Sequence, residues 1–364
     1  MTQQPSPLDI RELRVAAIIA MAAILAGAMV LQHFVPTPPD DSGSLEQKVD
    51  KVERDARSLL QELQQGDIDL ATFLSQLQQI GVHPAFLAVL AVQGTAILGG
   101  IAGLLALAVV YAVGVRIKPR GNWAPGTPWL PLDALEVILF FGCCQVAVSV
   151  AWAVFMRIWT MLLGAAPPSP TEQLHPGHLA ALYIIPAAAT LALLWRRTPG
   201  GLRRLWTTLR ARTAPVLTRL LQGAGGYAAA LPLLVVAKYL NPFGGDTFSS
   251  NPVISMLLEP RSVAAWILLL VVIGLCAPVF EEVMFRGCAY PAFRRRWGVG
   301  VAVLASGLLF GAIHGQLGEF VPLTVLGIVF AVLYELSGSV LPCIVAHAAV
   351  NTITLLQIML LSGA

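Results

Sequence analysis

Among the polar side chains inside long apolar runs in the last quarter of this 364-residue chain, six could act together in acid–base chemistry or hydrogen bonding. They are Glu281, Glu282, Arg286, His314, His347 and Asn351. Ionisable groups are costly inside a bilayer, so they usually pair with one another and mark a functional pathway. Their position in apolar runs therefore predicts a functional site.

The spacing of these residues predicts which of them lie together. Residues four apart share one face of a helix, so Glu282 and Arg286 are predicted to pair. The same spacing occurs twice more, in Phe310 with His314 and in His347 with Asn351. Glu281 lies about 100° further round the helix than Glu282 and so faces elsewhere. One carboxylate is then neutralised by an arginine while its neighbour stays available for chemistry.

The depth of the polar groups in the membrane gives a second prediction. A helix rises about 1.5 Å per residue, so Glu281 lies roughly 20 Å and His314 roughly 24 Å from the face that carries Arg294. On the same scale His347 and Asn351 lie at roughly 14 and 20 Å. Four polar groups from three helices are thus predicted to share one layer.

Such a layer could hydrolyse an amide. Glu281 is a candidate general base toward a water molecule, and His314 could share that water. His347 and Asn351 carry hydrogen-bond donors that could stabilise a developing oxyanion. Glu282 and Arg286 are predicted to support this geometry.

Other hydrolytic chemistries have weaker support in the sequence. There is no GxSxG motif for a serine nucleophile and no HExxH helix for zinc. Glu281, His314 and His347 are of the ligand types that Zn²⁺ or another divalent metal accepts, but no motif spacing fixes them. A metal-dependent site therefore stays open beside a metal-free one.

The elements that must position these residues are membrane helices. The chain is 57% hydrophobic and 12% charged, with a mean hydropathy of +0.74, which predicts an all-α polytopic membrane bundle. A helix of roughly 20 apolar residues crosses a bilayer. We count nine such runs, with eight as the alternative: 15–35, 85–115, 133–156, 179–195, 214–240, 262–290, 298–316, 320–337 and 339–362.

The basic residues predict the orientation, because cytoplasmic loops collect Lys and Arg. They gather in three loops, at 116–120, 196–212 and 294–296. With nine spans all three loops lie on the N-terminal side, so the N-terminus is predicted to be cytoplasmic in a multi-pass protein of the cell (inner) membrane. The net charge of +3 mostly reflects these loops, and no basic patch with interleaved aromatic residues predicts nucleic-acid binding. Membrane lipids are the expected surroundings.

Composition divides the chain into four parts. They are an N-terminal anchor (1–35), an extracytoplasmic helical hairpin (36–84), accessory membrane helices with a basic loop (85–260) and a polar-layer core (261–364). The hairpin carries apolar stripes at helical spacing between 45 and 80. It is predicted either to pack on itself or on the bilayer, or to screen substrates or mediate homo-oligomer formation. Outside the layer, Glu335 is expected to reach water at the cytoplasmic end of its span.

The segments EEVMFRG, FGAIH and HAAVN resemble the three signatures of the CPBP family, EExxxR, FxxxH and HxxxN. This family, also described by its Abi domain, groups type II CAAX prenyl proteases with bacteriocin-processing and immunity proteins. The three motifs occur in the family's order on apolar spans, and they cover about the last 100 residues of the chain.

The resemblance implies an intramembrane protease acting on a membrane-embedded or lipid-modified peptide. It implies that Glu281 and His314 activate water and that His347 and Asn351 stabilise the oxyanion, with Glu282 and Arg286 in support. Members are often named metalloproteases, while a metal-free glutamate mechanism has been argued for the CAAX branch. The predicted external hairpin departs from a plain CAAX-processing protein.

Two other functions fit the same residues. A scaffold or immunity-type protein of this fold would use the polar layer only for binding or stability. A proton-coupled transporter could also use a buried Glu/His relay, although the chain shows no internal repeat. Loss of cleavage on substitution of Glu281 separates the protease from both.

Overall fold

The structure is a computed structural model, and it describes most of the predicted membrane region. The described residues are 84–112, 129–163, 176–197, 215–242 and 262–361, with scattered positions between 54 and 76. The predicted anchor at 15–35, most of the predicted hairpin and the basic loop at 198–213 lie outside them.

All the regular structure in the described residues is helical, which confirms the predicted fold class. The accessory helices are α4 (Pro84–Ala112), α5 (Pro131–Leu163), α7 (Pro176–Arg197) and α9 (Val216–Tyr239). The C-terminal region contains α11 (Val263–Leu269), η1 (Leu270–Cys276), α12 (Ala277–Met284), η2 (Phe285–Ala289), α13 (Tyr290–Ile313), η3 (Leu317–Glu319), α14 (Phe320–Ser337) and α15 (Val340–Leu361).

Six helices in the described part are long and apolar enough to cross a membrane. The longest is a continuous run of 51 residues from Val263 to Ile313, which would extend about 77 Å, more than twice the hydrocarbon thickness of about 30 Å. Gly298 interrupts it with a φ of 82° and a ψ of 179°, a conformation open to glycine. The predicted boundary between two spans at 298 is confirmed, while the total of nine spans stays a prediction.

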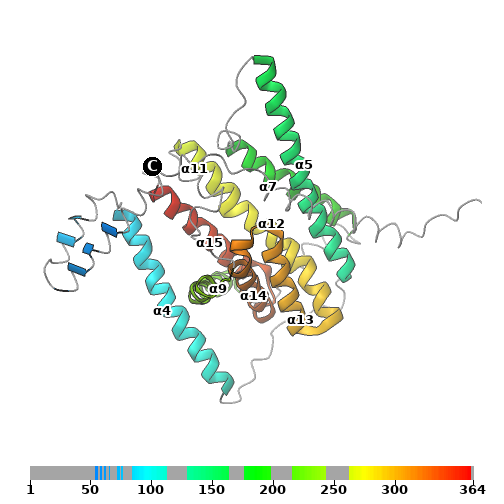
Figure 1. The fold of residues 1–364 in the computed structure, drawn as a ribbon. Helices are drawn as coiled ribbons and strands as arrows, with labels where there is room; N and C mark the ends of the chain where they lie inside the picture. Colours follow the sequence, from blue (N-terminus) through cyan, green and yellow to red (C-terminus); the bar gives the residue numbers. More distant parts are fainter. Residues whose placement is uncertain are drawn as a thin grey trace, which may run out of the picture.

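The C-terminal helices pack closely around the predicted polar layer. α13 runs against α14, while α9 packs against α4, α14 and α15, so α9 lies between α4 and the C-terminal helices in Figure 1. α5 and α7 form a second pair, and α5 extends beyond the rest of the bundle in the same view. The outward faces of these helices carry exposed large apolar side chains, as expected of a bundle surrounded by lipid.

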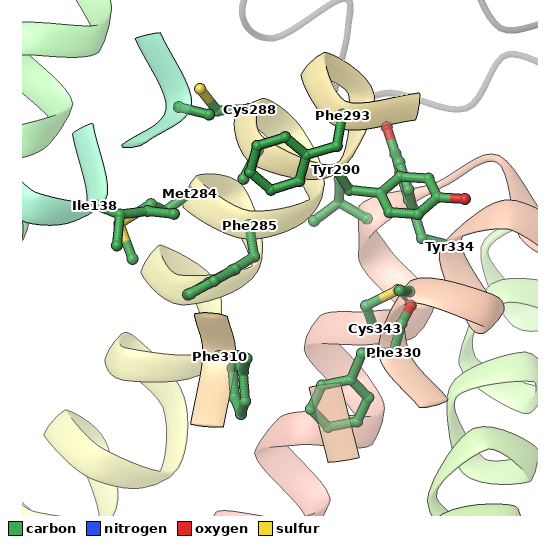
Figure 2. Close-up of a cluster of buried hydrophobic side chains, with 14 of the residues drawn as sticks. Ile138, Met284, Phe285, Cys288, Tyr290, Phe293, Phe310, Phe330, Tyr334 and Cys343 are labelled. Carbon is green, nitrogen blue, oxygen red and sulfur yellow. Dashed lines mark hydrogen bonds between the residues drawn. The ribbon is translucent and has the colours of Figure 1, made fainter. Parts of the chain in front are cut away.

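Aromatic side chains fill the centre of the bundle. Phe285 of η2, Phe310 of α13 and Phe330 of α14 are fully buried and lie near one another in Figure 2. Phe310 meets the other two rings edge-on, with centroids 5.2 and 6.1 Å away. Edge-to-face pairs are favourable, so these rings form a rigid apolar wall for the groups described below.

Helix winding near the two glutamates departs from the sequence prediction. The segments η1 and η2, on either side of α12, are π-helical, whereas the spacing argument assumed a regular α-helix throughout. π-Helical turns in α-helices are rare and often occur at functional sites. The wider winding changes which backbone carbonyls are free to accept hydrogen bonds from other side chains. A side chain of the site, described below, bonds to one of these carbonyls.

The expectation for Glu335 is wrong. Its side chain is buried, because α14 packs against α13 and brings it two partners from that helix. Glu335 Oε2 accepts hydrogen bonds from the Tyr290 hydroxyl at 2.7 Å and from Arg294 Nε at 2.8 Å. A second bond from Arg294 Nη2, 2.9 Å long, reaches Glu335 Oε1. Glu335 thus fastens α13 to α14 at this end of the bundle instead of reaching water.

Candidate active site

Glu282 lies at the centre of the polar layer. Its Oε1 atom accepts a hydrogen bond from Arg286 Nη1 at 3.1 Å and another from His347 Nδ1 at 3.0 Å. The Glu282 and Arg286 side chains are fully buried. The predicted pair at a spacing of four is confirmed, and the bond to His347, 65 residues away, is a contact that the spacing argument missed.

Arg286 is held by more than its ion pair. Its Nη2 atom donates to the backbone carbonyl of Gly327 in α14 at 2.6 Å. Its guanidinium also lies between 5.2 and 5.5 Å from the ring centroids of Phe285, Phe310 and Phe330, within range of cation–π attraction. A buried charge with these partners is fixed in place, so Arg286 can hold Glu282 and, through it, His347.

His347 lies between the two glutamates, with one ring nitrogen toward each of them. Because Glu282 Oε1 accepts, we assign the proton to Nδ1, which leaves Nε2 facing Glu281. Nε2 lies 4.0 Å from Glu281 Oε2, too far for a direct hydrogen bond and a separation that a small molecule can bridge. Glu281 Oε2 is buried and has no hydrogen-bond partner among the described residues.

His314 lies at the end of α13, half-buried. Its Nδ1 atom is 2.7 Å from the carbonyl oxygen of Phe310, so Nδ1 donates and Nε2 keeps a lone pair. The predicted alignment of Phe310 with His314 is confirmed. The Phe310 ring packs against His314 and His347, with centroids 5.1 and 5.5 Å away, so one aromatic side chain contacts both histidines.

Asn351 is placed by the π-helical segment η1. Its Nδ2 atom donates to the carbonyl of Ile273 at 2.9 Å, and the adjacent Thr352 hydroxyl is 3.5 Å from the carbonyl of Gly274. An amide nitrogen carries two hydrogens, so Asn351 keeps a second donor after this bond is made. His347, one turn earlier on α15, instead contacts α12.

α7 supplies a neighbour that the sequence did not indicate. Tyr183 lies close enough to Glu281 for the two side chains to interact electrostatically. Tyr183 lies in a mostly apolar helix about 100 residues before the motifs, and nothing in its spacing marks it. The packing of α7 against α11 and η1 brings the helix to this site.

The arrangement does not form the metal site that the sequence left open. Within the described ranges, no three His, Cys, Asp or Glu side chains gather closely enough to hold a metal ion. A catalytic Zn²⁺ normally has three protein ligands. Glu281, His314 and His347 therefore do not fit Zn²⁺ as they are placed here.

Comparison with known proteins finds a family match for the region that contains this site. Residues 263–353 match the model of the family described as "Type II CAAX prenyl endopeptidase Rce1-like". No solved structure matches the chain.

Two curated relatives are similar to the chain over part of its length. "Putative membrane peptidase YdiL" of Bacillus subtilis (strain 168) is 29% identical over 90 residues, which are 25% of this chain and 37% of that protein. "Uncharacterized 24.3 kDa protein" of Escherichia coli is 32% identical over 112 residues, which are 29% of this chain and 52% of that protein. The chain thus spans about half of these relatives or less. Its C-terminal region, with both glutamates and both histidines, is thus similar to the Rce1-like family of type II CAAX prenyl endopeptidases over residues 263–353.

Proposed function

We propose that this protein is an intramembrane endopeptidase that hydrolyses a peptide bond in a membrane-embedded or lipid-modified substrate. The family of residues 263–353 is one of endopeptidases, and the described helices make the chain a multi-pass membrane protein. One observation carries the proposal. Glu281 Oε2 is buried without a hydrogen-bond partner among the described residues, 4.0 Å from a histidine whose other nitrogen is fixed.

In the proposed mechanism Glu281 is the general base. A water molecule near Glu281 Oε2 loses a proton to the carboxylate as its oxygen forms a bond to the peptide carbonyl carbon. His314, with its Nε2 lone pair, helps to orient that water. Glu281 then gives the proton to the leaving nitrogen as the C–N bond breaks, so one water is consumed and an acid and an amine are produced.

The oxyanion formed in this step needs donors. The second N–H of Asn351 is one, and its direction is fixed by the bond from the first to Ile273. His347 can donate from Nε2 when the ring is an imidazolium, whose charge Glu282 stabilises at Nδ1. Arg286 and Glu282 act only through His347 and are therefore positioning residues.

The test compares the wild-type protein with Glu281→Gln in lipid nanodiscs, on quenched-fluorescent peptides with and without a prenyl group. We expect cleavage to fall by about 10²–10⁴-fold because glutamine cannot accept the proton. Glu136→Gln is the matched control, since Glu136 pairs with Arg197 away from the site, and it should cleave like wild type. Both variants are first checked for an unchanged unfolding temperature.

Three outcomes change the proposal. Cleavage retained by Glu281→Gln removes Glu281 as the base. A folded wild-type protein that cleaves no peptide while it binds one favours the scaffold function. A parallel arm adds a chelator, and because the donors do not fit a metal, activity is expected to survive. Cleavage activity that the chelator removes and added Zn²⁺ restores would instead assign a metal to the reaction.

A further inference from the structure

His314 stands at the start of the loop that joins α13 to α14. Its backbone N–H still bonds to the carbonyl of Gly311 at 3.4 Å, and that of Gly315 bonds to Ala312 at 3.2 Å. Gly315 then takes a φ of 70°, a left-handed conformation that ends helices. The loop therefore leaves the helix directly after the histidine, and its path decides where the last turn of α13 ends.

The loop is tied from outside the matched family region. The side-chain Nδ2 of Asn241 donates to the carbonyl of Gly318 at 2.6 Å, across 77 residues of sequence. Asn241 follows α9, and its backbone N–H bonds to the carbonyl of Lys238 in the last turn of that helix at 3.3 Å. α9 itself packs on α14 and α15. The tie thus joins the loop to a helix that is fixed against the rest of the site.

The tied residue is only four positions from His314. Gly318 lies in the short 3-10 turn Leu317–Glu319, which is closed by a bond from the Glu319 N–H to Gln316 at 3.2 Å. A compact loop of this length transmits a displacement of one end to the other, because few rotatable bonds lie between them.

We infer that Asn241 is a positioning residue, which fixes the α13–α14 loop and so the direction of the His314 ring. The inference rests on the proposed function for its effect on cleavage, but the tie itself does not depend on any activity. It gives α9, which lies outside residues 263–353, a role in the reaction.

The sharpest variant is Asn241→Asp. Aspartate has nearly the same shape but no N–H to donate, and its oxygen repels the Gly318 carbonyl. Lys238→Ala is the matched control, because Lys238 is exposed in the last turn of the same helix. Both are compared with wild type in the full-length protein by thermal unfolding, amide hydrogen exchange and cleavage kinetics.

We expect faster exchange of the amides of residues 314–319 in Asn241→Asp and wild-type exchange in α14 and α15. The kcat should fall about tenfold, since a small misplacement of a reacting group is costly, while KM changes less than about twofold and the unfolding temperature is unchanged. Lys238→Ala should match wild type in every measurement.

Each failure points to a different error. Unchanged loop exchange in Asn241→Asp shows that the tie does not hold the loop and overturns the inference. Faster loop exchange with an unchanged kcat shows that the tie exists but does not position His314, which also overturns it. If the wild-type protein cleaves nothing, the proposed function fails, while the exchange measurement still decides whether Asn241 holds the loop.

Discussion

At the scale of single residues, the site is organised by charges that are fully removed from water. Arg286 and His347 both donate to Glu282 Oε1, and the Gly327 carbonyl accepts a further hydrogen bond from Arg286. Desolvation of each charge is expensive, so such a group is stable only as a whole. Glu281, beside it, has a buried Oε2 atom that lacks a hydrogen-bond partner among the described residues and lies 4.0 Å from His347 Nε2.

Removal of one charge from this group should therefore destabilise the protein strongly. Glu282→Gln leaves Arg286 buried without its counter-charge, and we expect the free energy of unfolding to fall by about 3–5 kcal/mol. Denaturant unfolding in detergent measures the change. Glu136→Gln, in an ion pair whose arginine is 33% exposed, should cost about 1 kcal/mol or less. Equal losses in the free energy of unfolding for the two substitutions would contradict this argument. They would show that the buried Glu282 group is no more costly to disrupt than a partly exposed ion pair.

At the scale of elements, α13 and α14 approach each other closely through glycines on both helices. Gly307 and Gly311 of α13 face Thr324 and Ile328 of α14, and Gly327 of α14 faces Gly307 and Phe310. Small residues let helix backbones approach within the membrane. Phe310 can reach both histidines only because Gly327 leaves room for it.

A methyl group at Gly327 should disturb this contact. In Gly327→Ala the new Cβ would lie 2.8 Å from Phe310 Cβ and 2.9 Å from Gly307 Cα, so α13 and α14 must separate. We expect a loss of about 1–3 kcal/mol in the free energy of unfolding, together with reduced cleavage as Phe310 moves. Gly300→Ala on α13 has open space and should be neutral or stabilising by up to about 1 kcal/mol. A Gly327→Ala protein as stable as wild type would contradict the argument from close packing.

At the scale of the whole molecule, the region that matches the family is about 90 residues long and is packed within a larger helical bundle. The match covers residues 263–353, yet α9 packs against α14 and α15, and α7 packs against η1. Hydrogen bonds between Gln93 and Gln357 also join α4 to α15. The accessory helices are thus part of the surroundings of the site, and Asn241 is the clearest route by which one of them can affect it.

The orientation of the bundle stays a prediction that reporter fusions can test. We propose that the N-terminus is cytoplasmic, because the three basic loops lie on its side of the membrane. In a Gram-negative host, fluorescent-protein fusions after residues 120 and 212 should fluoresce, and alkaline phosphatase fusions after residue 175 should be active. The opposite pattern would show that the protein has the inverse orientation, with the His314 loop on the cytoplasmic side.

What the sequence determined by itself is what helix geometry makes local. Apolar runs of sufficient length gave the membrane helices, and the break at Gly298 gave the boundary between two of them. The pairs Glu282 with Arg286 and Phe310 with His314 followed from a spacing of four, because residues one turn apart on a helix are neighbours whatever surrounds them.

Only the tertiary structure decided which helix faces which polar group. His347 bonds to Glu282 across 65 residues, Asn351 to Ile273 across 78, Glu335 to Arg294 across 41 and Asn241 to Gly318 across 77. Such contacts depend on how packed helices are rotated and how far apart they lie. π-Helical segments and glycine contacts alter both quantities, and the spacing of residues along one helix does not encode either. The same physical reason put Glu335 in the interior against expectation, since a carboxylate reaches water only when no neighbouring helix offers it a better partner.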